Sequence, residues 1–352
     1  MSGERNTKVL IVDDSAIVRK LLAECLASEP DMEVVGTAPD PFIARDKILS
    51  LRPDVLTLDI EMPRMDGLTF LKKLMRFHPM PVVVISSLAQ ASSKTAIEAL
   101  QCGAVEVLGK PGGPYSVGEL KRDLPLKIRA AAQARMAHRS SEPAAPEKPA
   151  APIPSYAVNA SAIIAIGAST GGTEAIREVL IRMPAESPGI VVVQHIPAVF
   201  SMAFANRLND LCKIRVKEAA DGDRVLPGQV LIAPGNFHMT LRKLGGEYRV
   251  AVHDGERVCY QRPSVDVLFE SVAKVAGADA IGAILTGMGA DGAEGMLKMK
   301  RAGARTVAQD EASCVVFGMP REAIKMGAVD RVLPLGRIAQ ELMALSSVAV
   351  RR

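Results

Sequence analysis

A serine stands in a glycine-rich turn in the second half of the chain. Residues 167–171 read GASTG, follow the apolar run AIIAI and precede a helical pattern. The G-x-S-x-G spacing between a strand and a helix is typical of an exposed nucleophilic serine, here Ser169. Ser and Gly are also ordinary helix-start residues, so Ser169 indicates catalysis only if suitable partners accompany it.

Two candidate partners follow strand-like runs in the same half. His195 ends the run GIVVVQH, and Asp291 lies in the turn TGMGADG after AIGAIL. Because strands of an open parallel sheet end at one edge, we expect these side chains to meet Ser169 as nucleophile, base and orienting carboxylate. The chain order Ser, His, Asp differs from the Ser, Asp, His order of α/β-hydrolases, which predicts a different fold.

Other histidines leave the identity of the base open at this point. His238 and His253 lie in the same half of the chain. A lone histidine in such a place is more often a surface or hydrogen-bonded residue than a catalyst. The same interpretation applies to His78 and His138, which lie outside the second folded unit.

The segment around Asp291 also matches a competing pattern. Gly287, Gly289 and Gly292 are spaced as G-x-G-x-x-G between a strand-like run and a helical one, and Asp310 follows the next such run. This is the spacing of a dinucleotide-binding turn. Asp291 inside the turn argues against it, because its charge would lie beside a pyrophosphate and the helix dipole would not offset that repulsion.

Acidic residues end two strand-like runs in the first half of the chain. Asp13 and Asp14 follow the first run, and Asp59 ends the third. Converging carboxylates favour a shared hard cation, and oxygen ligands without Cys or His indicate Mg²⁺. Ser86 and Lys110, at the ends of the fourth and fifth runs, add a hydroxyl and a positive charge. Although each residue alone could cap a helix, the set could capture a phosphoryl group on Asp59.

The elements that must position these residues alternate between apolar runs and helical patterns. The runs in the first half are KVLIV, EVVGTA, DVLTLD, PVVVIS and EVLGK. Those in the second half are AIIAIG, GIVVVQH, KIRVKEA, VLIAPG, AIGAILTG and RTVAQ. This alternation predicts an α/β fold with a doubly wound, mostly parallel sheet in each half, five-stranded in the first. A Gly-Gly pair between two alternating runs at 238–254 predicts a β-hairpin insertion in the second.

A stretch rich in Pro, Ala and Ser separates the two halves. Residues 136–160 show no apolar periodicity, although another strand-like run follows at once. Such a composition is typical of an extended linker between folded units. We therefore expect one domain over 1–135, a Pro/Ala-rich linker over 136–160 and a second domain over 161–352.

Length and charge limit the function classes. At 352 residues the chain suits two domains, and 43 Lys+Arg against 39 Asp+Glu leave a net charge of +4, too little to favour nucleic acid as a partner. The five cysteines are scattered and lack metal-ligand spacing. No apolar run suits a signal peptide or a membrane span, so we expect a cytoplasmic protein without direct membrane insertion.

The first half resembles a known family through KVLIVDDS, DVLTLDIEMPRMDG, VVVISS and LGKPGG. These motifs are similar to those of response-regulator receiver domains, which have a (βα)5 fold. The resemblance implies Asp59 as phosphoacceptor, Asp13 and Asp14 as further Mg²⁺ ligands, Ser86 as switch hydroxyl and Lys110 as phosphate partner. Val107 departs from the pattern, because many receivers have an aromatic switch residue there.

The second half resembles the catalytic domain of the CheB family of chemotaxis methylesterases. The matching segments are GASTGGTEA, VVVQHIP, APGNFHM, HDG, RPSVDVLF, LTGMGADGAEGM and AQDEASCVVFGMP. The resemblance implies hydrolysis of glutamate γ-methyl esters on methyl-accepting chemotaxis receptors, and deamidation of receptor glutamines, by Ser169, His195 and Asp291. It also implies Met288 as an oxyanion donor, Thr170 in the site, and a CheA-type histidine kinase as phosphodonor.

The two resemblances together predict a phosphorylation-regulated serine hydrolase. Mg²⁺ would serve phosphorylation of the first domain, and ester hydrolysis would need no cofactor. The alternative from another class is a receiver joined to a non-hydrolytic nucleotide-binding or scaffolding module.

Overall fold

The computed structural model describes residues 6–87, 90–111, 116–135, 159 and 161–347. The chain divides into two units, residues 1–144 and 145–352. The expected linker at 136–160, and with it His138, lies outside the described residues, apart from Asn159. None of the helices in the described part of the chain combines the length and apolar character needed to cross a membrane.

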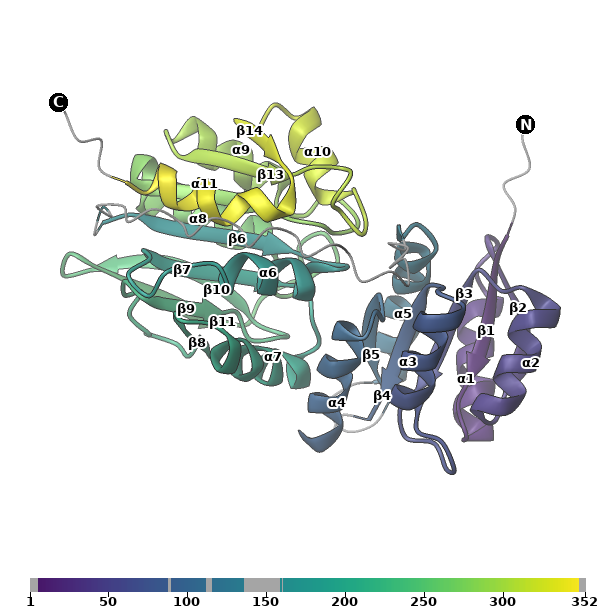
Figure 1. Ribbon diagram of the computed structural model, residues 1–352. Coiled ribbons are helices and arrows are strands. Elements are labelled where there is room, and N and C mark those ends of the chain that lie inside the picture. Colours follow the sequence, from purple (N-terminus) through teal and green to yellow (C-terminus); the bar gives the residue numbers. More distant parts are fainter. Residues whose placement is uncertain (1–5, 88–89, 112–115, 136–158, 160, 348–352) are drawn as a thin grey trace. The chain divides into compact units, whose positions relative to one another are not determined.

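The first unit is a five-stranded parallel sheet in the order β2-β1-β3-β4-β5 (Figure 1). Its strands are β1 (Thr7–Val12), β2 (Met32–Ala38), β3 (Val55–Asp59), β4 (Val82–Ser86) and β5 (Glu106–Gly109). Its helices are α1 (Ala16–Ala27), α2 (Pro41–Leu51), α3 (Gly67–Phe77), α4 (Gln90–Gln101) and α5 (Val117–Ala132). Each strand is followed by a helix, so the predicted (βα)5 arrangement is confirmed.

The second unit is a seven-stranded sheet in the order β14-β13-β12-β6-β7-β9-β8, and every neighbouring pair is parallel. Its strands are β6 (Ile163–Ala168), β7 (Gly189–Gln194), β8 (Arg215–Glu218), β9 (Gln229–Ile232), β12 (Ala280–Ile284), β13 (Arg305–Gln309) and β14 (Arg331–Leu333). Strands β10 (His238–Leu244) and β11 (Glu247–His253) form the predicted antiparallel hairpin.

The helices of the second unit fall into two groups. They are α6 (Gly172–Leu180), α7 (Ala198–Leu211), α8 (Val265–Val275), the short 3₁₀ helix η1 (Gly277–Asp279), α9 (Ala293–Arg301), α10 (Met319–Lys325) and α11 (Leu335–Leu345). Helix α6 contacts α7 and α11, whereas α9 contacts α8 and α10. Because parallel crossovers are right-handed, helices of chain segments that wind in opposite directions cover opposite faces of the sheet.

Both sheets reverse their winding direction at one point. In the first unit, the chain passes from β1 to β2 on one side and from β3 to β4 and β5 on the other. In the second, it passes from β6 to β7 on one side and from β12 to β13 on the other. Loops diverge at such a switch point and leave a crevice at the carboxyl ends of the strands. The predicted site residues therefore stand at the crevice of each sheet.

Candidate functional site

Ser169 lies in the loop between β6 and α6, next to the loop that follows β12. Its main-chain N–H donates to the Thr286 carbonyl at 3.0 Å. A Cβ at Gly287 would lie 2.8 Å from the Ser169 Cβ, so only glycine lets the two loops approach this closely. The Ser169 side chain is thereby packed at the switch point, where it is almost fully buried.

His195 follows β7 and joins the loops of β6 and β12. Its N–H donates to the Ala168 carbonyl at 3.1 Å, and its ring Nε2 lies 2.8 Å from Oδ2 of Asp291. The other ring nitrogen, Nδ1, is buried and has no hydrogen-bond partner among the described residues. If the Nε2 proton is held by the carboxylate, Nδ1 is the atom left to accept a proton from a nucleophile.

Asp291 is bound at the start of helix α8 as well as to His195. Its carboxylate accepts hydrogen bonds from Ser264 Oγ at 2.7 Å, Val265 N–H at 2.7 Å and Asp266 N–H at 3.1 Å. Burial alone would raise the pKa of Asp291, but the bonds from His195, Ser264 and Val265 outweigh it and lower the pKa. Asp291 is therefore held as an anion beside the imidazole.

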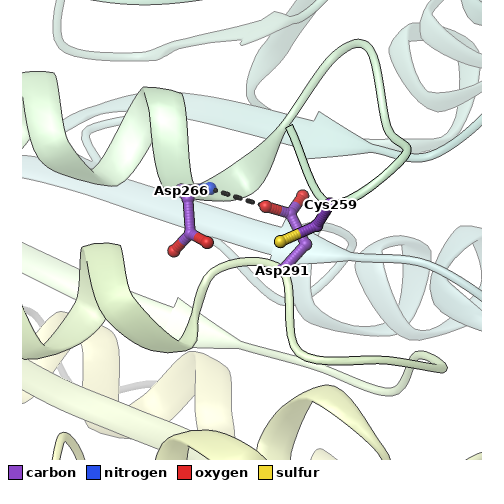
Figure 2. A group of neighbouring side chains, drawn as sticks. All are labelled: Cys259, Asp266 and Asp291. Atoms are coloured by element: carbon purple, nitrogen blue, oxygen red, sulfur yellow. Dashed lines mark hydrogen bonds between the residues drawn. The ribbon is translucent and has the colours of Figure 1, made fainter. Parts of the chain in front are cut away.

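A second carboxyl group and a thiol lie beside Asp291. Figure 2 shows that the Cys259 sulfur lies next to the Asp291 carboxylate, while the Asp266 carboxylate points away from it. Ligand atoms of the three residues lie within 4.8 Å of one another. Both oxygens of Asp291 already accept hydrogen bonds, so this group is better described as a support for Asp291 than as a cation site. Burial, with the nearby Asp291 charge, raises the pKa of Asp266 to about 6.

One side chain that was not predicted from the sequence joins Ser169 to His195. Gln194, the last residue of β7, donates from Nε2 to the Ser169 carbonyl at 2.8 Å and to the His195 carbonyl at 3.3 Å. A Cβ at Gly172 would lie 2.1 Å from Gln194 Oε1, so the last glycine of GASTGG makes room for this amide. Its position directly before His195 was the only sequence signal that could have identified it.

Thr286 holds the loops from the other side. Its Oγ1 donates to the Thr170 carbonyl at 2.9 Å and accepts from Val316 N–H at 3.0 Å. Gln309 Oε1 accepts the N–H of Thr286 at 2.8 Å. Neither Thr286 nor Gln309 was predicted as a site residue, because a polar residue at a strand end is equally typical of a loop contact.

The main-chain N–H groups near Ser169 differ in whether they already donate a hydrogen bond. Those of Ser169 and Gly287 donate to the carbonyls of Thr286 and Val316, at 3.0 Å each. The Met288 N–H makes no hydrogen bond within the described residues, and its residue is half-buried. Thr170, directly after Ser169, is buried. An oxyanion on a bound ester would therefore find an unengaged donor at Met288.

The alternative bases occupy other surroundings. His238 starts β10, where its Nε2 lies 2.8 Å from the Glu256 carbonyl and its Nδ1 accepts from Ser264 N–H at 3.3 Å. Burial lowers the pKa of His238, which keeps the ring neutral. His253 ends β11 and bonds the Asp254 carbonyl, and His78 is the C-cap residue directly after α3 in the first unit. Neither nitrogen of His238 is available to a nucleophile.

The glycine pattern at 287–292 serves loop packing. Gly287 contacts Ser169, and a Cβ at Gly292 would lie 2.6 Å from Val265 Cγ1. Asp310, expected at a ribose in the competing interpretation, accepts from the N–H and Oγ of Ser313 at 3.0 and 2.6 Å. Gly287, Gly292 and Asp310 thus have local partners, whereas a Cβ at Gly289 would meet nothing within 4 Å and its φ of 89° is what favours glycine there. Local contacts and backbone conformation therefore account for the pattern without a dinucleotide.

The acidic cluster of the first unit forms at its own switch point. Asp13 follows β1, Asp59 ends β3, and Lys110 after β5 lies 3.0 Å and 2.7 Å from their Oδ2 atoms. Burial and the charge of Asp13 raise the pKa of Asp59 to about 6, against the opposing effect of Lys110. Burial would lower the pKa of Lys110, but its bonds to the carboxylates raise it. Ligand oxygens of Asp13, Asp14 and Asp59 lie within 4.8 Å of one another.

The remaining residues of this cluster lie at neighbouring strand ends. Ser86, the last residue of β4, is buried, with its Oγ 3.4 Å from the Ser87 carbonyl. Val107 is buried within β5, one strand away. Asp14 is exposed beside the buried Asp13. The carboxylates leave a repulsive site that a divalent cation would relieve, so the residues present fit Mg²⁺.

Family models and relatives match both units of the chain. Residues 164–342 match a model described as CheB methylesterase, and residues 9–119 match one described as response regulator receiver domain. A protein-glutamate methylesterase/protein-glutamine glutaminase of Syntrophus aciditrophicus is 59% identical over 96% of this chain and 98% of its own. A Salmonella typhimurium enzyme of the same name is 54% identical over 96% of each chain.

One solved structure matches the second unit. The catalytic domain of the Thermotoga maritima CheB methylesterase is 40% identical and covers 52% of this chain and 98% of that one, with a TM-score of 0.51. Neither this structure nor the two relatives is a nucleotide-binding module by name, so the alternative function is not favoured.

Proposed function

The chain belongs to the CheB methylesterase family, and from that premise we propose that Ser169, His195 and Asp291 carry its hydrolysis of glutamate methyl esters. The chain is a protein-glutamate methylesterase with glutaminase activity, joined to a receiver domain. The observation that carries the residue assignment is the bond from His195 Nε2 to Asp291, which leaves Nδ1 buried and unengaged. Asp291 fixes the ring and stabilises the imidazolium that forms when Nδ1 takes a proton.

The first half of the reaction transfers the acyl group to Ser169. Its Oγ attacks the ester carbonyl while its proton passes to His195 Nδ1, and the carbonyl becomes a tetrahedral oxyanion. The Met288 N–H is the proposed donor to that oxyanion, with Thr170 lining the same pocket. Collapse of the intermediate breaks the bond to the methoxy group, which leaves as methanol with the proton from His195.

The second half returns the enzyme to its starting state. Water attacks the acyl-serine while His195 accepts its proton, and the Ser169 oxygen leaves and is reprotonated. The free glutamate side chain is released. For glutamine the same steps release ammonia in place of methanol, so the one constellation accounts for both activities in the relatives' name.

The receiver domain regulates this activity through Asp59, which we propose as the phosphoacceptor. Its carboxylate oxygen would attack the phosphorus of a phosphohistidine on a partner kinase, and we propose a kinase of the CheA type. Asp13, Asp14 and Asp59 would hold Mg²⁺, which supplies charge neutralisation during the transfer. Lys110 would then pair with the new phosphoryl oxygens, and Ser86 would bond to them as the switch hydroxyl.

Domain limits and partners complete the proposal. We assign residues 1–135 to the receiver, 136–160 to a linker and 161–352 to the esterase. The substrates are methyl-accepting chemotaxis receptors, whose modified glutamates would be reached in the cytoplasm. No nucleic acid or membrane insertion is required by this chemistry.

Substitution of each reacting residue separates the two chemistries. Ser169→Ala should abolish methanol release from methylated receptors and leave Mg²⁺-dependent phosphorylation of Asp59 intact. Asp59→Asn should block phosphorylation and retain the basal rate of ester hydrolysis. Full esterase activity in a folded Ser169→Ala protein would exclude Ser169 as nucleophile.

A further inference from the structure

Helices α8 and α9 begin side by side. The start of α8 is bonded by a carboxylate from the loop before α9, and the start of α9 is bonded by a carboxylate from α8. Asp291, just before α9, accepts the N–H groups of Val265 and Asp266 in the first turn of α8. Asp266 in turn accepts the Gly295 N–H, in the first turn of α9, at 2.6 Å. Figure 2 shows the bond from the Asp266 main chain to Asp291 and the Asp266 carboxylate directed away from it.

Helix α9 lacks a capping side chain of its own. Its N-cap residue is Gly292, with a φ of 93°, and the first N–H groups of any helix have no partner within the helix. Asp266 supplies the missing acceptor at Gly295, the third residue of α9, which is a usual target of an N-cap oxygen. An ionised acceptor makes this bond stronger than a neutral one would.

The two helix starts are packed as closely as their main chains allow. A Cβ at Gly295 would lie 2.7 Å from Phe269 Cβ and 3.0 Å from the Asp266 carbonyl oxygen. A Cβ at Gly292 would lie 2.6 Å from Val265 Cγ1. The first turn of α9, and Asp291 immediately before it, therefore follow the position of α8.

We propose that Asp266 is a positioning residue for the reaction, because its bond to Gly295 holds the start of α9 where Asp291 meets His195. Asp266 does not touch the substrate or the reacting atoms in this proposal. Asp266 acts through Asp291. The proposal therefore rests on the proposed function, in which Asp291 orients His195. Loss of the bond would let Asp291 shift against the imidazole.

Several titratable groups surround Asp266, and the carboxylates among them make its position electrostatically costly. Asp291 and Glu294 lie at the start of α9, Cys259 lies on the turn before α8, and His238 of β10 bonds Ser264. His195 lies beyond, on the far oxygen of Asp291. Buried carboxylates this close repel each other. The bonds from Gly295 and Gly292 are what offset that repulsion at Asp266.

Three variants of the full-length protein test the proposal. Asp266→Ala removes the acceptor, Asp266→Asn keeps an acceptor oxygen without the charge, and Glu294→Gln removes an exposed charge from the same turn of α9. The measurement is kcat and KM for methanol release from methylated chemoreceptor in membranes. Circular dichroism and melting confirm that each variant is folded.

We expect Asp266→Ala to lower kcat about tenfold to a hundredfold, as for a misplacement of reacting groups, with KM nearly unchanged. Asp266→Asn should recover most of kcat, and Glu294→Gln should match the wild type. Folded Asp266→Ala protein with wild-type kcat would overturn the proposal, as would an Asp266→Asn variant as slow as Asp266→Ala. A Ser169→Ala arm separates the two failures, since activity there would instead contradict the proposed function.

Discussion

His195 presents Nε2 to Asp291 at 2.8 Å and keeps Nδ1 buried on the opposite side of its ring. A neutral imidazole has one donor and one acceptor nitrogen, so the bond to the carboxylate determines which nitrogen accepts a proton. His238 differs, because its two nitrogens already meet the Glu256 carbonyl and the Ser264 N–H. The hydrogen-bond partners, rather than proximity in sequence, distinguish His195, the proposed base, from His238.

Substitution of the two buried histidines should therefore have unequal effects. His195→Ala should lower kcat by roughly three to four orders of magnitude, because the general base is lost. His238→Ala should lower kcat no more than about tenfold, because its direct effect is that the Ser264 N–H loses its acceptor. Methanol-release rates of folded variants would measure both, with the half-buried His253→Ala as the control. A His238 variant slower than the His195 variant would reassign the base.

Gln194 should matter to turnover although it is not a reacting group. Gln194→Leu keeps the volume and removes the amide that binds the carbonyls of Ser169 and His195. We expect kcat to fall about tenfold to a hundredfold, because a small displacement of nucleophile and base slows transfer. Phosphorylation of Asp59 should be unchanged, since it takes place in the other unit. Unchanged kcat in a folded variant would contradict this role.

Much of the fold follows from the sequence because the strands are buried runs. Every residue of β6, β7 and β12 is buried, and such uninterrupted apolar runs indicate a parallel sheet covered on both faces. Helices α8 and α10 and strand β14 were not predicted separately. Strand β14 has three residues, too short for a periodic pattern.

The site could be predicted only in part. Ser169, His195 and Asp291 end or follow runs whose strand character was evident, so their shared edge follows from topology. The partners of Asp291 did not follow, because Ser264 and Asp266 belong to a helix whose place depends on close packing at Gly292 and Gly295. Which nitrogen of His195 faces the carboxylate likewise depends on side-chain geometry, which the spacing of residues in the sequence does not predict.

The ionisation of Asp266 should make the free energy of unfolding depend on pH. Its pKa is raised from 3.8 to about 6 by burial and by Asp291, so the fold favours the protonated form. This contribution to stability is present below about pH 4 and is lost as the pH rises through about 6. The amide of Asp266→Asn does not ionise, so the variant avoids this loss. Its free energy of unfolding, relative to that of the wild type, should therefore rise by up to about 3 kcal/mol between pH 4 and 7.

Denaturant unfolding of the two proteins across this pH range measures the gain. Ser169→Ala serves as the control, because it removes no titratable group and its difference from the wild type should be nearly constant over this pH range. A constant difference for Asp266→Asn as well would mean that Asp266 ionises normally in the fold.

Phosphorylation of Asp59 should fall in acid because its carboxylate is the nucleophile. Burial, followed by the charge of Asp13, raises its pKa to about 6, and Lys110 opposes the rise through its bond at 2.7 Å. As the Mg²⁺ concentration is lowered, the pH at which labelling by a small phosphodonor is half-maximal should therefore approach about 6. Added Mg²⁺ should move this midpoint to lower pH, because a cation favours the ionised carboxylate.

Removal of Lys110 tests the same balance of charges with the opposite sign. Lys110→Met deletes a positive partner of Asp59, so the ionised form becomes less favourable and the midpoint should move above pH 6. The plateau rate should also fall, because Lys110 neutralises phosphoryl oxygens in the proposed mechanism, but only the midpoint reports the pKa of Asp59. Lys72→Met, which removes an exposed partner of Glu98, should leave the midpoint in place. Equal midpoints in the wild type and Lys110→Met would show that Lys110 does not set the ionisation of the phosphoacceptor.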